Sequence, residues 1–136
     1  MREFSWPARV YWEDTDGGAI VYYANYLRYL ERARTEWLRA LGHSQLELGR
    51  DPGILFTVVS VQIDYRAPAR LDDELDVSCA PQAEGPASLR FLQKIQRRVG
   101  AQLLVEANVR VACVDARTLR PKRLPRFIVQ AIAGES

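Results

Sequence analysis

The sequence has few of the residues on which most metal sites and nucleophilic sites depend. Its 136 residues include one histidine, His43, and two cysteines, Cys79 and Cys113. One histidine and two distant cysteines do not supply the ligands of a zinc site. No catalytic motif surrounds His43, so a Ser-His-Asp or Cys-His arrangement would have to recruit it without support. We therefore expect no metal ion, and we interpret His43 as a residue of the surface or of a helix end.

The sequence also lacks a long apolar run and an excess of charge of one sign. No stretch approaches the roughly 18 residues of a membrane span, and the N-terminal residues do not resemble a signal peptide. The 19 basic and 17 acidic residues give a formal net charge of +2, which is too balanced to indicate a nucleic-acid partner. These absences predict a cytoplasmic protein that does not span a membrane.

The composition is that of one ordinary globular domain covering residues 1–136. Hydrophobic residues make up 48% and charged residues 26%, a balance typical of such domains. Cys79 and Cys113 each continue an apolar alternation, which predicts two buried free thiols. A domain this small buries a core with little to spare, so we expect a ligand cleft to lie between subunits.

One long amphipathic helix is predicted over about residues 22–41. Apolar residues recur at helical spacing through this stretch, while charged residues fill the opposite side. Gly42 follows directly, at a position where helices commonly end. The apolar side of such a helix must lie on a broad surface. Its apolar positions are Tyr26, Leu27, Leu30, Ala33, Trp37 and Leu41.

Strand-like alternation follows the helix and continues to about residue 113. Four segments alternate between apolar and polar residues, residues 89–99 less cleanly than the others, and the short turns between them favour antiparallel neighbours. A short strand is expected before the helix, at residues 10–13, and a short helix near residues 127–132. The pattern predicts an α+β fold in which a single helix covers one face of an antiparallel sheet. The four segments are 59–65, 75–79, 89–99 and 103–113, and in the first of them Val59, Val61, Ile63 and Tyr65 are expected to share one face.

Carboxylates gather just before the predicted helix, in residues 14–18, which read Asp-Thr-Asp-Gly-Gly. The first turn of a helix has unpaired N–H groups and a positive partial charge. A carboxylate at this place either caps the helix or works beside N–H donors that polarise a bound carbonyl group. A calcium loop is excluded because Gly18, Ala19 and Asn25 stand where such a loop needs a ligand, a glycine and a glutamate. An enzyme with this sequence would rely on carboxylates and backbone donors.

Residues 9–27, which read RVYWEDTDGGAIVYYANYL, closely resemble the signature of 4-hydroxybenzoyl-CoA thioesterase-like hotdog proteins. Within that group they are most similar to the Tol-Pal-associated acyl-CoA thioesterases. Shorter matches at residues 31–37, 64–73 and 111–115 extend the resemblance over nearly the whole chain. The resemblance implies a hotdog fold, in which a five-stranded antiparallel sheet wraps around one long central helix.

The resemblance also implies an assembly and an active site. Subunits of these proteins join edge to edge, commonly as homotetramers made of two dimers, and the active site lies at the dimer interface. Asp16 matches the essential carboxylate, and Tyr23 occupies the position whose backbone N–H faces the thioester oxygen. Family members usually have glycine where this chain has Ala19. Because only glycine adopts left-handed backbone angles freely, we expect the turn to shift by one residue.

These observations predict an acyl-CoA thioesterase that needs no cofactor. A thiolate leaves without a strong general acid, so such an enzyme tolerates the absence of a catalytic histidine. Asp16 would act either as a general base that activates water or as a nucleophile that forms an anhydride. The helix N-terminus would stabilise the oxyanion, and one such donor is typically worth about 3–4 kcal/mol. The sequence leaves open the role of Asp16, the preferred acyl group, and whether the acyl carrier is CoA or acyl carrier protein.

Two other functions have to be distinguished from hydrolysis. A hotdog dehydratase or hydratase needs a catalytic histidine in the helix region, whereas His43 lies beyond the far end of the predicted helix. A non-catalytic acyl-binding or scaffold protein would interact with acyl carrier protein or with enzymes of lipid synthesis. The intact Asp-Thr-Asp segment argues against a simple loss of activity, but it is compatible with a binding role beside catalysis.

Overall fold

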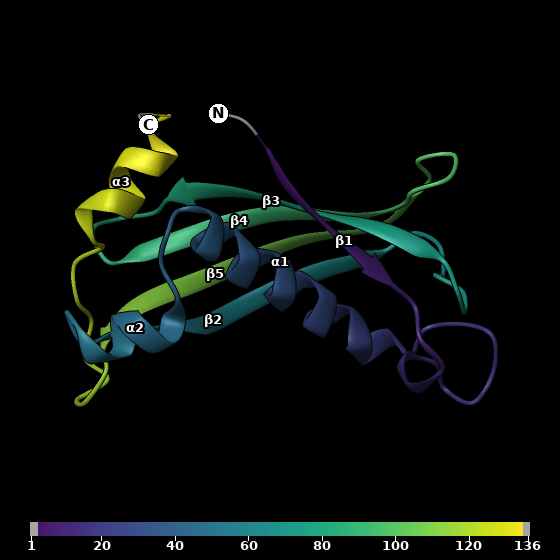
Figure 1. The fold of residues 1–136 in the computed structure, drawn as a ribbon, viewed down its shortest axis with the longest axis horizontal. Coiled ribbons are helices and arrows are strands. Elements are labelled where there is room, and N and C mark those ends of the chain that lie inside the picture. Colours follow the sequence, from purple (N-terminus) through teal and green to yellow (C-terminus); the bar gives the residue numbers. More distant parts are fainter. Residues whose placement is uncertain (1–2, 135–136) are drawn as a thin grey trace.

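Five strands form one antiparallel sheet in the order β1-β3-β4-β5-β2, as seen in the computed structural model, which describes residues 3–134 (Figure 1). Three helices accompany the sheet, and no helix in the described residues is long and apolar enough to cross a membrane. The strands are β1 (Phe4–Arg9), β2 (Ile54–Tyr65), β3 (Glu74–Ala83), β4 (Ser88–Arg97) and β5 (Leu103–Asp115), and the helices are α1 (Tyr26–Ala40), α2 (Gln45–Arg50) and α3 (Arg126–Ile132).

Helix α1 crosses one face of the sheet and buries its apolar side there (Figure 1). Leu30 and Ala33 are fully buried, and the Trp37 ring meets the Phe91 ring edge to face at a centroid distance of 5.5 Å. The helix ends at Ala40; Leu41 caps it, and Gly42 follows with a positive φ of 94°, which suits glycine. The predicted helix over about residues 22–41 is thus confirmed. Its first residues form a separate 3₁₀ turn, η2 (Tyr23–Asn25), which runs into α1.

The strand expected at residues 10–13 is wrong. The first strand, β1, lies earlier in the chain and pairs with β3, while Trp12–Asp14 form a 3₁₀ turn, η1. This turn closes because the Asp14 carboxylate accepts a hydrogen bond from the Tyr11 N–H group, three residues back. Pro7 is tolerated in β1 because this strand is at an edge of the sheet and pairs on one side only.

Strand β2 contains a bulge that changes which of its side chains face the helix. The pairing with β5 shifts between Val58 and Ser60, which leaves Val59 without an opposite residue. Val58 therefore shares a face with Val61 and Tyr65, and Val59 falls outside the alternation. The expected alternation was correct from Val61 onward and wrong at Val59.

The helix covers the sheet unevenly, and β2 is the strand it covers least. Helix α1 packs mainly against β3 and β1, whereas β2, at the opposite edge of the sheet, packs mainly against the short helix α2 and meets α1 where the Tyr65 and Tyr26 rings lie 5.6 Å apart. On the helix-facing side of β2, Val58, Val61 and Tyr65 remain 46%, 40% and 46% exposed. The structure therefore has a free strand edge beside a row of exposed apolar side chains.

Both cysteines are free and buried, as the alternation pattern predicts. Cys79 is on β3 and Cys113 on β5, and each is completely covered. Burial raises the pKa of the Cys79 thiol to about 12, from an ordinary value of 9.0. The pKa of Cys113 is also raised, again by burial.

We predict that neither thiol of the native protein reacts with Ellman's reagent at pH 8, and that both react once the chain is unfolded in urea. Because the folded pKa of Cys79 lies above the unfolded value, the protonated thiol favours the folded state. Its contribution to stability is complete below about pH 9 and is lost as the pH rises toward about 12. The free energy of unfolding should therefore fall less steeply over this window in Cys79→Ala. Reaction of the native protein at the rate of free cysteine would contradict the burial.

Candidate functional site

The loop that carries Asp16 joins the turns η1 and η2 and folds back on itself. Thr15 pairs with Val21 as an antiparallel bridge, and the Asp16 N–H group donates to the carbonyl oxygen of Ile20 at 3.3 Å. The reversal uses Gly17, whose φ is +86°, so the left-handed residue is a glycine although position 19 is alanine. The left-handed position thus lies two residues before Ala19, not one as expected.

The Asp16 side chain is exposed at this reversal. Its Oδ1 atom lies 3.5 Å from the place that a Cβ atom on Gly18 would occupy, so the carboxylate rests over the glycine backbone. Within residues 3–134 the carboxylate accepts no hydrogen bond and forms no ion pair. Asp16 is therefore a carboxylate whose oxygen atoms are available to a ligand.

Free backbone donors lie at the start of η2, close to this loop. The Tyr22 N–H group donates to the carbonyl oxygen of Asp14 at 3.0 Å, and the Asn25 N–H group donates to that of Tyr22 at 2.8 Å. The N–H groups of Tyr23 and Ala24, which lie between them, have no acceptor in the described part of the chain. The structure thus leaves the Tyr23 amide available for the role that the resemblance assigns to it.

Asp14 is buried and fully hydrogen-bonded, which the sequence did not predict. It is 7% exposed, and both carboxylate oxygens are engaged: Oδ1 accepts from the Asn25 amide at 2.9 Å and Oδ2 from the Tyr11 N–H group at 2.8 Å. The capping interpretation holds only for the small turn η1, since neither carboxylate caps α1. No short-range pattern indicates the bond between Asp14 and Asn25, because eleven positions separate them.

The Tyr29 hydroxyl is buried next to Asp14 and has no hydrogen-bond partner within residues 3–134. Its pKa is raised above the ordinary value, first by burial and then by the neighbouring Asp14 carboxylate. The phenol therefore stays protonated. A hollow of about 290 Å³ adjoins Asp14 and Asn25; its walls are Glu13, Asp14, Thr15, Tyr22, Ala24, Asn25 and Arg28.

Exposed aromatic residues flank the Asp16 loop in the sequence. They are Tyr11, Trp12, Tyr22 and Tyr23, and the rings of Tyr22 and Tyr23 lie against each other with centroids 5.0 Å apart. The Tyr65 hydroxyl, at the end of β2, donates to the carbonyl oxygen of Tyr23 at 3.2 Å. The helix start, and with it the Asp16 loop, is therefore next to the uncovered edge of the sheet.

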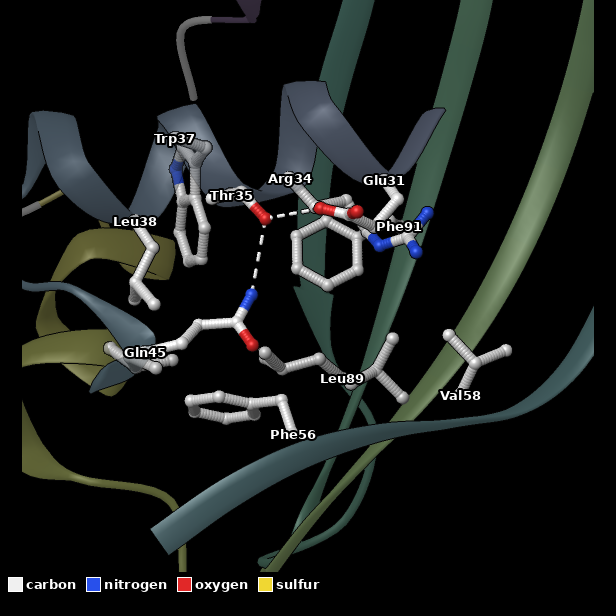
Figure 2. A pocket seen from close by; sticks show the side chains of 12 residues that line it. Glu31, Arg34, Thr35, Trp37, Leu38, Gln45, Phe56, Val58, Leu89 and Phe91 are labelled. Carbon is white, nitrogen blue, oxygen red and sulfur yellow. Dashed lines mark hydrogen bonds between the residues drawn. The ribbon is translucent and has the colours of Figure 1, made fainter. Parts of the chain in front are cut away.

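A second cavity, of about 320 Å³, lies farther along α1, between the helix and the sheet (Figure 2). Hydrogen bonds run from the Gln45 amide to Thr35 and from Thr35 to Glu31, and the Arg34 guanidinium donates to Gln93. Burial lowers the pKa of Arg34. The cavity offers an apolar interior with polar groups at its rim. Its apolar walls are Trp37, Leu38, Phe56, Val58, Leu89, Phe91, Val111 and Ile128.

His43 is at the far end of α1 from Asp16 and takes no part in the site. Its ring stacks on the ring of Phe127 in α3, with centroids 3.6 Å apart. The backbone N–H group of His43 donates to the carbonyl oxygen of Leu38, in the last turn of α1. The interpretation of His43 as a helix-end residue is confirmed.

Comparisons with known proteins show which family the chain belongs to. The sequence model of the thioesterase-like superfamily matches residues 10–132. An acyl-CoA thioester hydrolase, YbgC, from Escherichia coli O6:H1 is 44% identical over 93% of this chain and 92% of its own length. The acyl-CoA thioesterase YbgC of Haemophilus influenzae is 41% identical over 94% of this chain and 93% of its own length.

Solved structures show the same fold. A 1,4-dihydroxy-2-naphthoyl-CoA thioesterase from Synechocystis superposes with a TM-score of 0.90 at 26% identity, covering 97% of this chain and 96% of that one. A probable thioesterase from Bartonella henselae superposes with a TM-score of 0.85 at 32% identity, covering 91% of this chain and 100% of that one. The sheet wrapped around one long helix is therefore a hotdog fold, and the chain belongs to the thioesterase-like superfamily.

Proposed function

We propose that this chain is an acyl-CoA thioesterase in which Asp16 is the reactive carboxylate. Membership of the superfamily and the names of the YbgC relatives support the activity. One observation supports the residue. The Asp16 carboxylate is unengaged and lies two positions after Asp14. The Asp14 carbonyl oxygen accepts the N–H group of Tyr22, and the next residue, Tyr23, has a free N–H group. The loop thus brings an acceptor and a donor to the same end of α1.

The proposed reaction needs only these two kinds of group. As a general base, Asp16 removes a proton from water while the water oxygen attacks the thioester carbon. Alternatively, Asp16 attacks the carbon itself, and water then hydrolyses the anhydride. In both routes the N–H groups of Tyr23 and Ala24 stabilise the oxyanion, the carbon–sulfur bond breaks, and CoA leaves as a thiolate. One proton of the attacking water ends on the CoA thiolate, so the products are the free carboxylic acid and CoA.

We further propose that the active form is a homodimer joined through the β2 edges, with a tetramer as a higher assembly. A free strand edge of twelve residues with exposed apolar neighbours is a surface that soluble proteins cover. The Tyr65–Tyr23 hydrogen bond connects this edge to the helix start. A second chain at the edge would also cover the aromatic residues that flank the Asp16 loop. A cytoplasmic location and acyl carrier protein as an alternative carrier stay predictions from the sequence.

Replacing Asp16 by asparagine should lower kcat by about 100-fold or more, because a general base or nucleophile is lost. Purified protein would be assayed for thiol release from CoA esters between acetyl and palmitoyl, and from benzoyl-CoA. The thermal unfolding midpoint should not change, since the Asp16 side chain is exposed and unbonded. Asp72→Asn, the same change at another exposed loop residue, serves as the matched control. Hydrolysis of none of these esters by the wild type, or equal turnover by Asp16→Asn, refutes the proposal and favours an acyl-binding protein.

Placing a charge in the apolar row of β2 should separate the subunits. For Val61→Lys we expect the dimer dissociation constant to rise at least about tenfold, as measured by sedimentation velocity, and turnover to fall with it. Gln62→Lys, the neighbouring residue on the opposite face, should leave the dimer intact. A wild-type protein that is fully active as a monomer would rule out this assembly.

A further inference from the structure

We propose that Asp14 and Asn25 form a buried clamp that holds Asp16 and the backbone donors of η2 in their working arrangement. Asp14 is then a positioning residue, and the carboxylate that reacts is the exposed one two positions later. This inference rests on the proposed thioesterase function. The bond that carries it joins Asp14 Oδ1 to the Asn25 side-chain amide at 2.9 Å.

The clamp closes the Asp16 loop from both of its ends. Asp14 precedes Asp16 by two residues, and Asn25 follows Tyr23 by two residues. Their side chains bind each other, and the Asp14 carbonyl oxygen also accepts the Tyr22 N–H group at 3.0 Å. The two hydrogen bonds that Asp14 accepts therefore fix where the loop leaves η1 and where it enters η2. A shift of either end would change the distance between the Asp16 carboxylate and the Tyr23 amide.

Burial makes this polar pair rigid and selective. Asp14 and Asn25 are each 7% exposed. In such surroundings a hydrogen bond is electrostatically stronger than in water, and an unpaired polar atom is costly. Asp14 avoids that cost because each oxygen has a donor, one from Asn25 and one from Tyr11. The pair tolerates one arrangement of donors and acceptors, which is the property a positioning device needs.

Because both of its carboxylate oxygens already accept hydrogen bonds, Asp14 is not available as a general base. A carboxylate that accepts a backbone N–H group and a side-chain amide is held in place by both, whereas a general base must approach the water that it activates. Asp16 is exposed and has no such bonds in the described residues. The two carboxylates of one short motif thus differ in burial and in bonding, and the roles divide accordingly.

The test exchanges the two members of the clamp. Asn25→Asp places two acceptor-only groups face to face, and Asp14→Asn leaves one carbonyl oxygen to serve two donors. For each single variant we expect kcat to fall by about 10–100-fold with little change in KM, because a misplacement near 1 Å costs up to about 100-fold. The double variant Asp14→Asn/Asn25→Asp restores one donor and one acceptor at the bond and keeps the wild-type charge. It should recover kcat to within about threefold of the wild type.

Three outcomes would overturn the clamp. They are full activity of both single variants, no recovery in the double variant although it folds, and a change in KM alone. Failure to recover would instead make the Asp14 carboxylate itself part of the chemistry. Because Asn25→Asp could unfold the chain, Asn25→Ala is a second variant without the added charge, and Asp72→Asn again controls for the Asp-to-Asn change. Circular dichroism and thermal unfolding establish the folded state of each protein.

Amide hydrogen exchange separates failure of the clamp from failure of the thioesterase function. The Tyr22 N–H group, bonded to the Asp14 carbonyl oxygen, should exchange at least about tenfold faster in Asn25→Asp than in the wild type, and at the wild-type rate in the double variant. This readout needs no substrate. If the Tyr22 N–H group shows this exchange pattern in a protein without thioesterase activity, the clamp stands and the proposed function is rejected. If its exchange rate is unchanged in the variants of an active enzyme, the proposed function stands and the clamp is rejected.

Discussion

The position of the site depends on one packing constraint: a single helix covers a sheet that is wider than the helix. Helix α1 packs mainly against β3 and β1, with Trp37 on Phe91 of β4, and leaves Val58, Val61 and Tyr65 of β2 partly exposed. The helix start therefore lies beside an uncovered strand edge, to which the Tyr65–Tyr23 bond connects it. The exposed apolar row and the exposed Asp16 loop lie at the same edge, and a second chain there would cover both.

A rigid scaffold does not by itself hold a loop that reverses direction within a few residues. The Asp16 loop has few apolar side chains to bury, so its conformation depends on hydrogen bonds at its ends and on its contacts with the segment before β3. The Val21 N–H group donates to the Ala69 carbonyl oxygen at 2.9 Å, and the Leu71 N–H group donates to that of Ala19 at 2.9 Å. Ala69 is itself fixed, because its N–H group donates to the buried Tyr26 hydroxyl on α1. Core packing is thus transmitted to the loop through a few polar contacts.

The sequence predicted the elements that have a clear period and missed those that do not. Apolar residues recur at helical spacing in α1 and at nearly every second position in β3 to β5, because one side of each element is buried. Strand β1 is mostly exposed and has no such alternation, so it was placed too late in the chain, at the residues that form η1. The bulge at Val59 and the Asp14–Asn25 bond depend on partners distant in sequence, which local spacing does not reveal. Asp16 and Tyr23 were identified by resemblance, and the structure adds that the oxygen atoms of one and the N–H group of the other are unengaged.

The Asp-Thr-Asp segment shows how neighbouring residues of one type come to differ. A side chain that enters a 3₁₀ turn and a buried cluster acquires donors, and its carboxylate then contributes to structure. The carboxylate two positions later sits on a reversal around Gly17 and faces solvent. A pair of acidic groups can therefore divide into one that orients and one that reacts when their environments diverge, as in other enzymes with two carboxylates. The glycines after the pair sustain this difference, since the left-handed angle at Gly17 is the step that turns the chain back from the buried cluster toward η2.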